Sequence, residues 1–211
     1  MSWDLELLRL INVTWAHPAL DWLMPAVSAV DAWIPLFAVV VLVLLWRMRW
    51  RGFWIVLCVG VTIAVADGLV SRNLKFLAER VRPRSSVEGL LIRDLGHGRP
   101  EFMRFFSPPM VKESANQHRT KGGSFPSSHT MNMFAFATVI ALFSRRWAVA
   151  LYLLAALVAY SRLYCAAHWP SDIFPSVGMG ILLGLVIPRL LLRIACRLGL
   201  GQRFGIAEVR H

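Results

Sequence analysis

The sequence predicts an all-α membrane protein: a bundle of about five transmembrane helices, preceded by an amphipathic helix that lies at the membrane surface. Hydrophobic residues make up 57% of the 211 residues, above the roughly 45–50% of an average soluble domain. They gather in long runs, several near the ~20 residues that cross a bilayer. The first sixteen residues instead mix Asp4, Glu6 and Arg9 with apolar side chains, which is typical of an interfacial helix and not of a cleavable signal peptide.

Five apolar runs define the expected spans, and a short interfacial segment at 18–30 precedes the first. The runs cover residues 31–46, 53–77, 128–143, 147–164 and 170–192. We expect one membrane-embedded domain over 1–211. Its non-spanning parts are an interfacial segment at 1–30, an extracytoplasmic loop at 81–125 and a cytoplasmic tail at 194–211.

The short basic turns set the expected orientation. Arginines cluster between spans one and two, between spans three and four, and after span five: Arg47, Arg49, Arg51, Arg145, Arg146, Arg193, Arg197, Arg203 and Arg210. With five spans these clusters share one side, which the positive-inside rule makes cytoplasmic. The N-terminus and the loop at 81–125 then lie outside a bacterial-type inner membrane. We expect short helices in that loop, covering a functional site.

The net charge of +11, with 20 arginines among 23 cations, raises the question of nucleic acid. We expect no nucleic-acid partner, because most of the chain is apolar. Arginines that flank spans or surround an anionic substrate explain the charge better. Cys58, Cys165 and Cys196 are scattered through apolar segments and are expected to be packing residues.

Four span ends on the expected outer side carry reactive side chains. They are Lys75 and Arg82 after span two, Ser127, Ser128 and His129 before span three, Arg162 at the end of span four, and His168 and Asp172 before and within span five. The span count alone therefore brings two imidazoles, a carboxylate and three cations to one depth.

This combination suits a phosphate group. Lys75 and Arg82 are seven residues apart, so both point to one side if the helix continues through them. Arg162 adds a planar fork of donors, and Ser127 is a good N-cap for a helix whose free N–H groups bind anions. A neutral imidazole can attack phosphorus and a protonated one can assist the leaving oxygen. Asp172, one helical turn after His168, can hold the imidazole N–H.

The pattern Lys75-x6-Arg82-Pro83, Pro126-Ser127-Ser128-His129 and Ser161-Arg162-x5-His168-x3-Asp172 resembles the three-part signature of the type 2 phosphatidic acid phosphatase superfamily. The resemblance covers residues 75–172, about half of the chain. It implies a metal-independent phosphatase that needs no cofactor, with His168 as nucleophile, Asp172 as its orienting group and His129 as general acid. It also implies phosphate binding by Lys75, Arg82, Arg162 and Ser127.

One position departs from the signature, because Ser128 stands where glycine is usual. We expect Ser128 to contribute only its backbone N–H. Four nearby charges lie outside the signature and are expected to be solvated or to face lipid headgroups: Arg72, Glu79, Arg80 and Arg84. Gly178, Gly180 and Gly184 have the spacing of a close helix–helix contact.

The expected function is hydrolysis of a lipid phosphate, with membrane lipids as the other partners. Undecaprenyl diphosphate is favoured because the chain is short and the site faces outward; phosphatidate, phosphatidylglycerol phosphate and lipid A are alternatives. A lipid phosphotransferase would use the same intermediate, and product analysis separates the two. A vanadium peroxidase or a non-enzymatic lipid-binding protein fits less well. The sequence does not define the oligomeric state.

Overall fold

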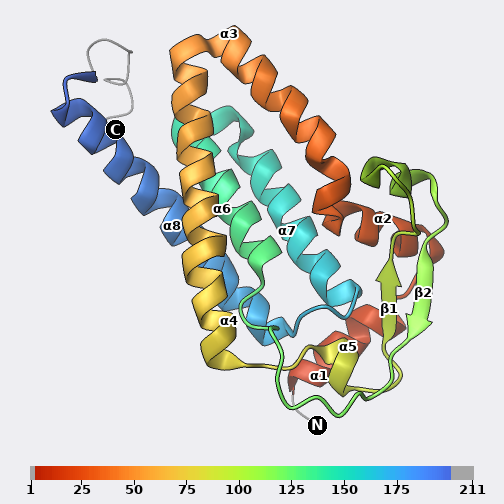
Figure 1. Ribbon diagram of the computed structural model, residues 1–211. Coiled ribbons are helices and arrows are strands. Elements are labelled where there is room, and N and C mark those ends of the chain that lie inside the picture. The colour runs from red at the N-terminus through yellow and green to blue at the C-terminus, as the bar shows by residue number, and fades with distance from the viewer. Residues whose placement is uncertain (1–2, 201–211) are drawn as a thin grey trace.

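The structure, a computed structural model, describes residues 3–200 as a helical bundle with a small β-hairpin at one end (Figure 1). The α-helices are α1 (Trp3–Arg9), α2 (Pro18–Ser28), α3 (Val30–Ala64), α4 (Arg72–Ala78), α5 (Pro83–Ser86), α6 (Ser128–Phe143), α7 (Ala148–Tyr164) and α8 (Pro170–Arg197). Two π-helical segments, Leu10–Thr14 and Val65–Ser71, follow α1 and α3, and 3-10 turns cover Glu101–Phe106 and Arg145–Trp147. Of the expected tail, residues 201–211 lie outside the described part of the chain.

Within residues 3–200, three helical segments are long and apolar enough to cross a membrane. They are Val30–Ser86, Arg145–Tyr164 and Pro170–Arg197, and the apolar helix Ser128–Phe143 is shorter. The first of these segments contains both of the first two expected spans. The expected helices at 31–46 and 53–77 correspond to two arms of α3 on either side of a kink, and the second arm continues through the π-helical segment into α4.

A sharp bend divides α3 into two arms (Figure 1). Arg49 adopts a non-helical backbone there (φ 47°, ψ −118°), and the second arm runs back along the bundle. Gly52 makes the bend possible, because a Cβ at this position would collide with the Leu44 carbonyl group. The bend thus keeps Arg47, Arg49 and Arg51 together at one end of the bundle.

Helices α6 and α8 form the centre of the bundle, with α7 beside α6. Gly180 and Gly184 of α8 face α6, where a Cβ would press on the backbone oxygens of Met131 and Ala135. Gly178 faces open space. The expected close contact is therefore confirmed for two of the three glycines.

The N-terminal segment forms α1 and the π-helical turn that follows it, and both pack against the rest of the protein. Leu8 and Asn12 are fully buried and Asp4 is nearly so. Asn12 donates hydrogen bonds to the carbonyls of Leu91 and Tyr164. Trp15 and Trp22 of the same region are exposed. Because of these contacts, the segment is an integral part of the fold.

The segment 81–125 contains a feature that the sequence analysis missed. Strands β1 (Leu91–Asp94) and β2 (Met110–Glu113) form an antiparallel hairpin, so the all-α prediction is wrong for this loop. Arg93 of β1 is buried and pins the hairpin to the bundle through an ion pair with Asp21 (2.5 Å) and a hydrogen bond to the Tyr164 carbonyl (3.0 Å). The two strands have four residues each, and only β1 has a buried residue, so they leave little periodic signal.

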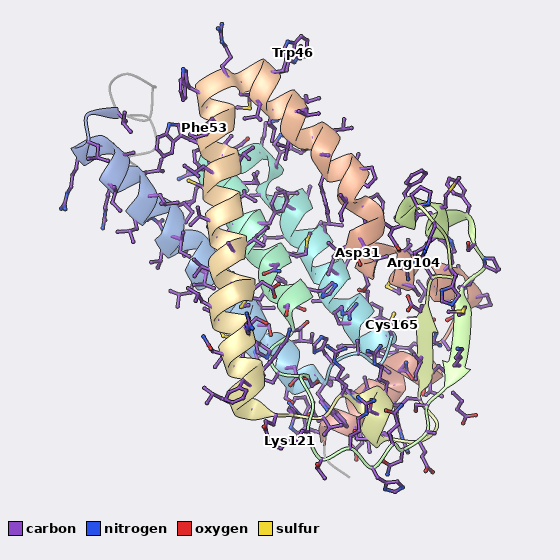
Figure 2. The ribbon with its side chains drawn as sticks, in the orientation of Figure 1. Asp31, Trp46, Phe53, Arg104, Lys121 and Cys165 are labelled. Atoms are coloured by element: carbon purple, nitrogen blue, oxygen red, sulfur yellow. The ribbon has the colours of Figure 1, made fainter. Side chains whose placement is uncertain are left out.

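The two ends of the bundle differ in what they carry. Figure 2 shows Trp46 beside the α3 bend at one end, with Lys121 at the opposite end. The turn between α6 and α7 lies at the Trp46 end (Figure 1). The C-terminus of α4 and the N-termini of α6 and α8 lie toward the Lys121 end (Figure 1).

Candidate active site

Four helix ends meet at the Lys121 end of the bundle, and their charged side chains come together. His129 of α6 lies within electrostatic range of Arg162, His168, Lys75 and Arg82. Lys75 and Arg162 lie within electrostatic range of each other as well. The convergence that the sequence analysis expected is therefore present, although one of its geometric reasons is wrong.

That reason was a continuous helix from Lys75 to Arg82. Helix α4 ends at Ala78, and Glu79 takes a left-handed conformation (φ 45°) that turns the chain away. Arg82 then enters as the N-cap of α5, ahead of Pro83 at the first helical position. A proline disfavours helix in the residue before it, so Arg82 reaches the site from a separate element.

The N-terminus of α6 supplies backbone donors. Ser127 is its N-cap, and Ser127 accepts a hydrogen bond from Thr130 Oγ1 (3.0 Å) while its own N–H donates to Ser176 Oγ (2.9 Å). Within the described chain, no group accepts from the N–H groups of Ser128 and His129. Such free N–H groups at a helix start favour an anion.

Ser128 does more than the sequence analysis expected. Its hydroxyl accepts a hydrogen bond from the Lys75 ammonium group and pairs with Ser71 Oγ at 2.7 Å. A glycine at this position would offer neither contact. The side chain of Ser128 therefore fixes Lys75 against the start of α6.

The end of α7 positions Arg162 and His168 together. The N–H of Ala167 donates to the Arg162 carbonyl (2.9 Å), and Ala166 is left-handed (φ 53°), so the chain closes tightly over the last helical turn. This turn carries the chain from Arg162 to His168 in six residues. The N–H of Arg84 also donates to the Ala166 carbonyl (3.2 Å), which brings α5 to the same place.

His168 is held by a backbone carbonyl and not by the predicted carboxylate. Its Nδ1 lies 2.6 Å from the carbonyl oxygen of Ser124, whereas Asp172 Oδ2 is 3.8 Å away. A carbonyl only accepts hydrogen bonds, so Nδ1 carries the proton and Nε2 keeps its lone pair. Asp172 acts on the ring through its nearby charge, and the expected direct hydrogen bond is absent.

Asp172 itself is fixed from several directions. It is the third residue of α8, and its Oδ2 accepts the N–H of the N-cap residue Trp169 (3.0 Å), half of a capping box. Ser124 Oγ also donates to Oδ2 (2.5 Å). Ser124 thus contacts both members of the pair, His168 through its carbonyl group and Asp172 through its hydroxyl.

Burial makes the His168 ring neutral at physiological pH. The residue is 2% exposed, and burial, reinforced by the charges of Arg162 and Arg82, lowers the pKa of His168 to about 4 against the opposing effect of Asp172. A neutral ring with a free Nε2 is a competent nucleophile.

Within residues 3–200, Lys75, Arg82 and Arg162 form no ion pair with a carboxylate, although Asp67 lies within electrostatic range of Lys75 and Asp94 within that of Arg162. The buried Nε of Arg162 has no hydrogen-bond partner among the described residues. Over the same residues, the guanidinium of Arg82 forms no ion pair either, whereas Arg93 and Arg104 are each paired with carboxylates. Arg84, half-buried, is also unpaired there and lies within electrostatic range of both Arg82 and Arg162.

Two residues at the site were missed or misjudged from the sequence. Ser124 stands two residues before the Pro126-Ser127 motif and gives no signal of its own. Arg80, expected to be solvated, forms ion pairs with Asp172 (2.5 Å) and Asp4 (2.6 Å). Its partner Asp4 lies 76 residues earlier, too far for sequence spacing to reveal.

Known proteins resemble this chain over most of its length. A lipid A 4'-phosphatase from Bacteroides thetaiotaomicron is 29% identical over 180 residues, which are 84% of this chain and 72% of that protein. An undecaprenyl-diphosphatase from Sulfolobus acidocaldarius is 29% identical over 184 residues, 85% of this chain and 74% of that protein. The crystal structure of Aquifex aeolicus LpxE has the same fold, with a TM-score of 0.65 at 24% identity over 90% of this chain and 96% of that one.

The family comparison agrees with the geometry. The model of the PAP2 superfamily matches residues 52–195, a range that includes every side chain of the convergent cluster. More than half of the chain is matched, and so the protein belongs to the PAP2 superfamily.

Proposed function

We propose that this protein is an integral membrane phosphatase that hydrolyses a lipid phosphate through a phosphohistidine intermediate. The observation that carries the proposal is a cluster of cations that form no ion pair with any carboxylate of the described residues, beside a neutral histidine. Lys75, Arg82 and Arg162 repel one another unless an anion lies between them. A phosphoryl group satisfies these cations and the free N–H groups of α6 together.

The first step forms a bond between His168 Nε2 and phosphorus while the bond from phosphorus to the lipid oxygen breaks. Nε2 is the attacking atom because Nδ1 donates to Ser124. His129 gives a proton to the departing oxygen as general acid. The ring of His168 becomes cationic, and the charge of Asp172 at 3.8 Å stabilises it.

The second step returns the enzyme to its first state. A water molecule attacks phosphorus, His129 takes one proton from it, and the N–P bond breaks with its electrons returning to Nε2. Inorganic phosphate leaves, and His168 is neutral again. The cations hold the phosphoryl oxygens through both steps, which is electrostatic stabilisation of the transition state. A cluster of cations is unsuited to a metal ion, so we propose catalysis without one.

The proposed topology has five crossings: the two arms of α3 with α4, then α6, α7 and α8. Arg145 and Arg146 and the arginines of the α3 bend then lie at the cytoplasmic side, which satisfies the positive-inside rule. The site at the Lys121 end faces the exterior of a bacterial-type inner membrane.

The number of unpaired cations at the site bears on the substrate class. Arg84 is a further unpaired cation near Arg82 and Arg162, beyond the three that bind one phosphate. This favours a headgroup with a second phosphate, and undecaprenyl diphosphate remains our first candidate. The names of the two relatives support lipid phosphates and differ over the lipid.

A panel of lipid phosphates tests the proposal directly. We expect the purified protein in detergent to release inorganic phosphate in the presence of EDTA, fastest from undecaprenyl diphosphate. Lipid A, phosphatidate and phosphatidylglycerol phosphate form the comparison set, and phosphate release is measured colorimetrically. Vanadate, a mimic of the phosphoryl group in transfer, should inhibit. Activity that vanishes with EDTA and returns with Mg²⁺ would rule out the metal-independent reaction, and a phosphorylated acceptor without free phosphate would indicate a transferase.

The pKa of His168 predicts an unusual acid limit. An ordinary histidine is half protonated near pH 6.5, whereas His168, with a pKa of about 4, stays neutral and nucleophilic well below that pH. We expect the acid-side loss of kcat/KM, which reports the free enzyme, to follow protonation of His168 and therefore to be centred near pH 4. Substrate phosphates themselves titrate near pH 6. The profile is therefore measured with a monophosphate and with a diphosphate, and only a limit that both substrates share is assigned to the enzyme. A shared half-maximum at pH 6.5 would contradict the buried, neutral ring.

A further inference from the structure

Arg80 joins two carboxylates that come from opposite ends of the chain. Its Nη1 lies 2.5 Å from Asp172 Oδ1, and its Nη2 lies 2.6 Å from Asp4 Oδ2. The guanidinium also lies over the indole ring of Trp169, 5.5 Å from its centre. The fork of the guanidinium therefore fixes the distance between α1 and the start of α8.

Asp4 is held in this place by α8 as well as by Arg80. Its Oδ1 accepts the backbone N–H of Ser171 (2.9 Å), and its Oδ2 accepts the Ser171 hydroxyl (2.6 Å). The N–H of Ser171 belongs to the first turn of α8, so Asp4 supplies a cap from another helix. The side chain of Asp4 is only 11% exposed, and Leu8, one turn further along α1, is fully buried.

The charges of Asp4, Arg80 and Asp172, which form a chain of ion pairs, do not cancel. Asp172 has a fully buried side chain, which is costly for a carboxylate that lacks a cation. Arg80 supplies that cation, but a single Arg80–Asp172 pair would be neutral and would attract a cationic His168 ring only weakly. Asp4 adds a second negative charge, which leaves the three groups with a net charge of −1 beside the ring.

We propose that Asp4 and Arg80 are positioning residues for the reaction: with Asp172 they form a net-negative chain that keeps the Asp172 carboxylate ionised and oriented toward His168. This inference rests on the proposed function. It makes helix α1 part of the catalytic unit, because the N-terminal helix provides the charge that balances the phosphohistidine cation.

Asp4→Asn is the informative variant, since it keeps the size of the side chain and removes its charge. We expect kcat to fall about tenfold with KM unchanged, as for an interaction made only in the transition state. Arg80→Gln should lower kcat on the order of tenfold to a hundredfold, the usual effect of removing a group that orients a reactive side chain from behind. Arg80→Lys keeps the charge and should recover part of the loss.

The loss of kcat in the double variant of Asp4→Asn and Arg80→Gln shows whether the two residues act together or independently. With Asp4 and Arg80 both neutralised, Asp172 alone again gives a net charge of −1. We therefore expect the double variant to lose no more than Arg80→Gln alone, where independent sites would multiply their losses. A rapid-quench measurement should locate the loss in the formation of the phosphoenzyme.

Lys121→Gln is the matched control. The substitution removes the ion pair between Lys121 and Glu79 (2.7 Å), in which the Lys121 side chain is 73% exposed. Glu79 precedes Arg80 in the sequence, and the pair makes no contact with Asp172. This variant should keep wild-type kcat. If the wild-type protein is active and Asp4→Asn leaves kcat unchanged, or if the losses of Asp4→Asn and Arg80→Gln multiply in the double variant, this inference is overturned. The proposed phosphatase function is unaffected by either result. A wild-type protein that hydrolyses no lipid phosphate removes the proposed function and this inference together.

Discussion

Replacing His168 with alanine is expected to lower turnover by on the order of 10⁴-fold or more, because the variant has no atom to accept the phosphoryl group. The expected signature is specific. Both kcat and the burst of phosphoenzyme disappear, while a lipid phosphonate that cannot be hydrolysed still binds within about tenfold of wild type, since the cations contribute most of the binding. Phosphate release and equilibrium binding to the detergent-solubilised protein measure the two effects.

The control for this variant is His97→Ala. His97 is an exposed histidine of the 81–125 loop, and its removal should leave kcat unchanged. Near-normal phosphate release from His168→Ala would eliminate His168 as the nucleophile. Loss of phosphonate binding in the same variant would point instead to collapse of the site, and the melting temperature would then fall as well.

The sequence predicted the membrane bundle and the cluster because both depend on local signals. Apolar length identified the three helical segments that are long enough to cross a membrane, and the alternating direction of successive helices brought Lys75, His129, Arg162 and His168 to one end. The bend at Arg49 lies in the turn that the arginines between the first two apolar runs had indicated. The condition that one helix continues from Lys75 to Arg82 is not met, because α4 ends at Ala78, and Pro83 disfavours helix in the residue before it.

The hydrogen bonds around His168 illustrate a different limit. The spacing from His168 to Asp172 fits a direct hydrogen bond and also fits a capping box, because both need a side chain in the first turn of α8. In the structure Asp172 caps α8, and His168 Nδ1–H donates its hydrogen bond to the Ser124 carbonyl oxygen. A backbone acceptor has no residue type, so no sequence pattern can identify it. The ion pair from Arg80 to Asp4 was hidden for another reason, since it joins helices that are distant in sequence.

Replacing Arg162 with glutamine should lower activity and raise the stability of the folded protein. Arg162 is half-buried as a residue, and its guanidinium Nε is buried without a protein partner within residues 3–200. In the free protein this cation therefore costs desolvation and repels Lys75 and Arg82, a cost that the phosphoryl group offsets only when it is bound. We expect kcat/KM to fall on the order of 10²–10³-fold, as when one donor to a developing anion is removed.

The same Arg162→Gln protein should melt higher than wild type by about 2–4 °C, which corresponds to roughly 1 kcal/mol in a protein of this size. Functional sites commonly carry such a stability cost. Arg162→Lys is the matched control: it keeps the charge and the repulsion but loses the planar fork, so activity should fall without any gain in melting temperature. A lower melting temperature for Arg162→Gln would mean that the guanidinium supports the fold, and the interpretation of this cluster as an anion site would lose its main physical support.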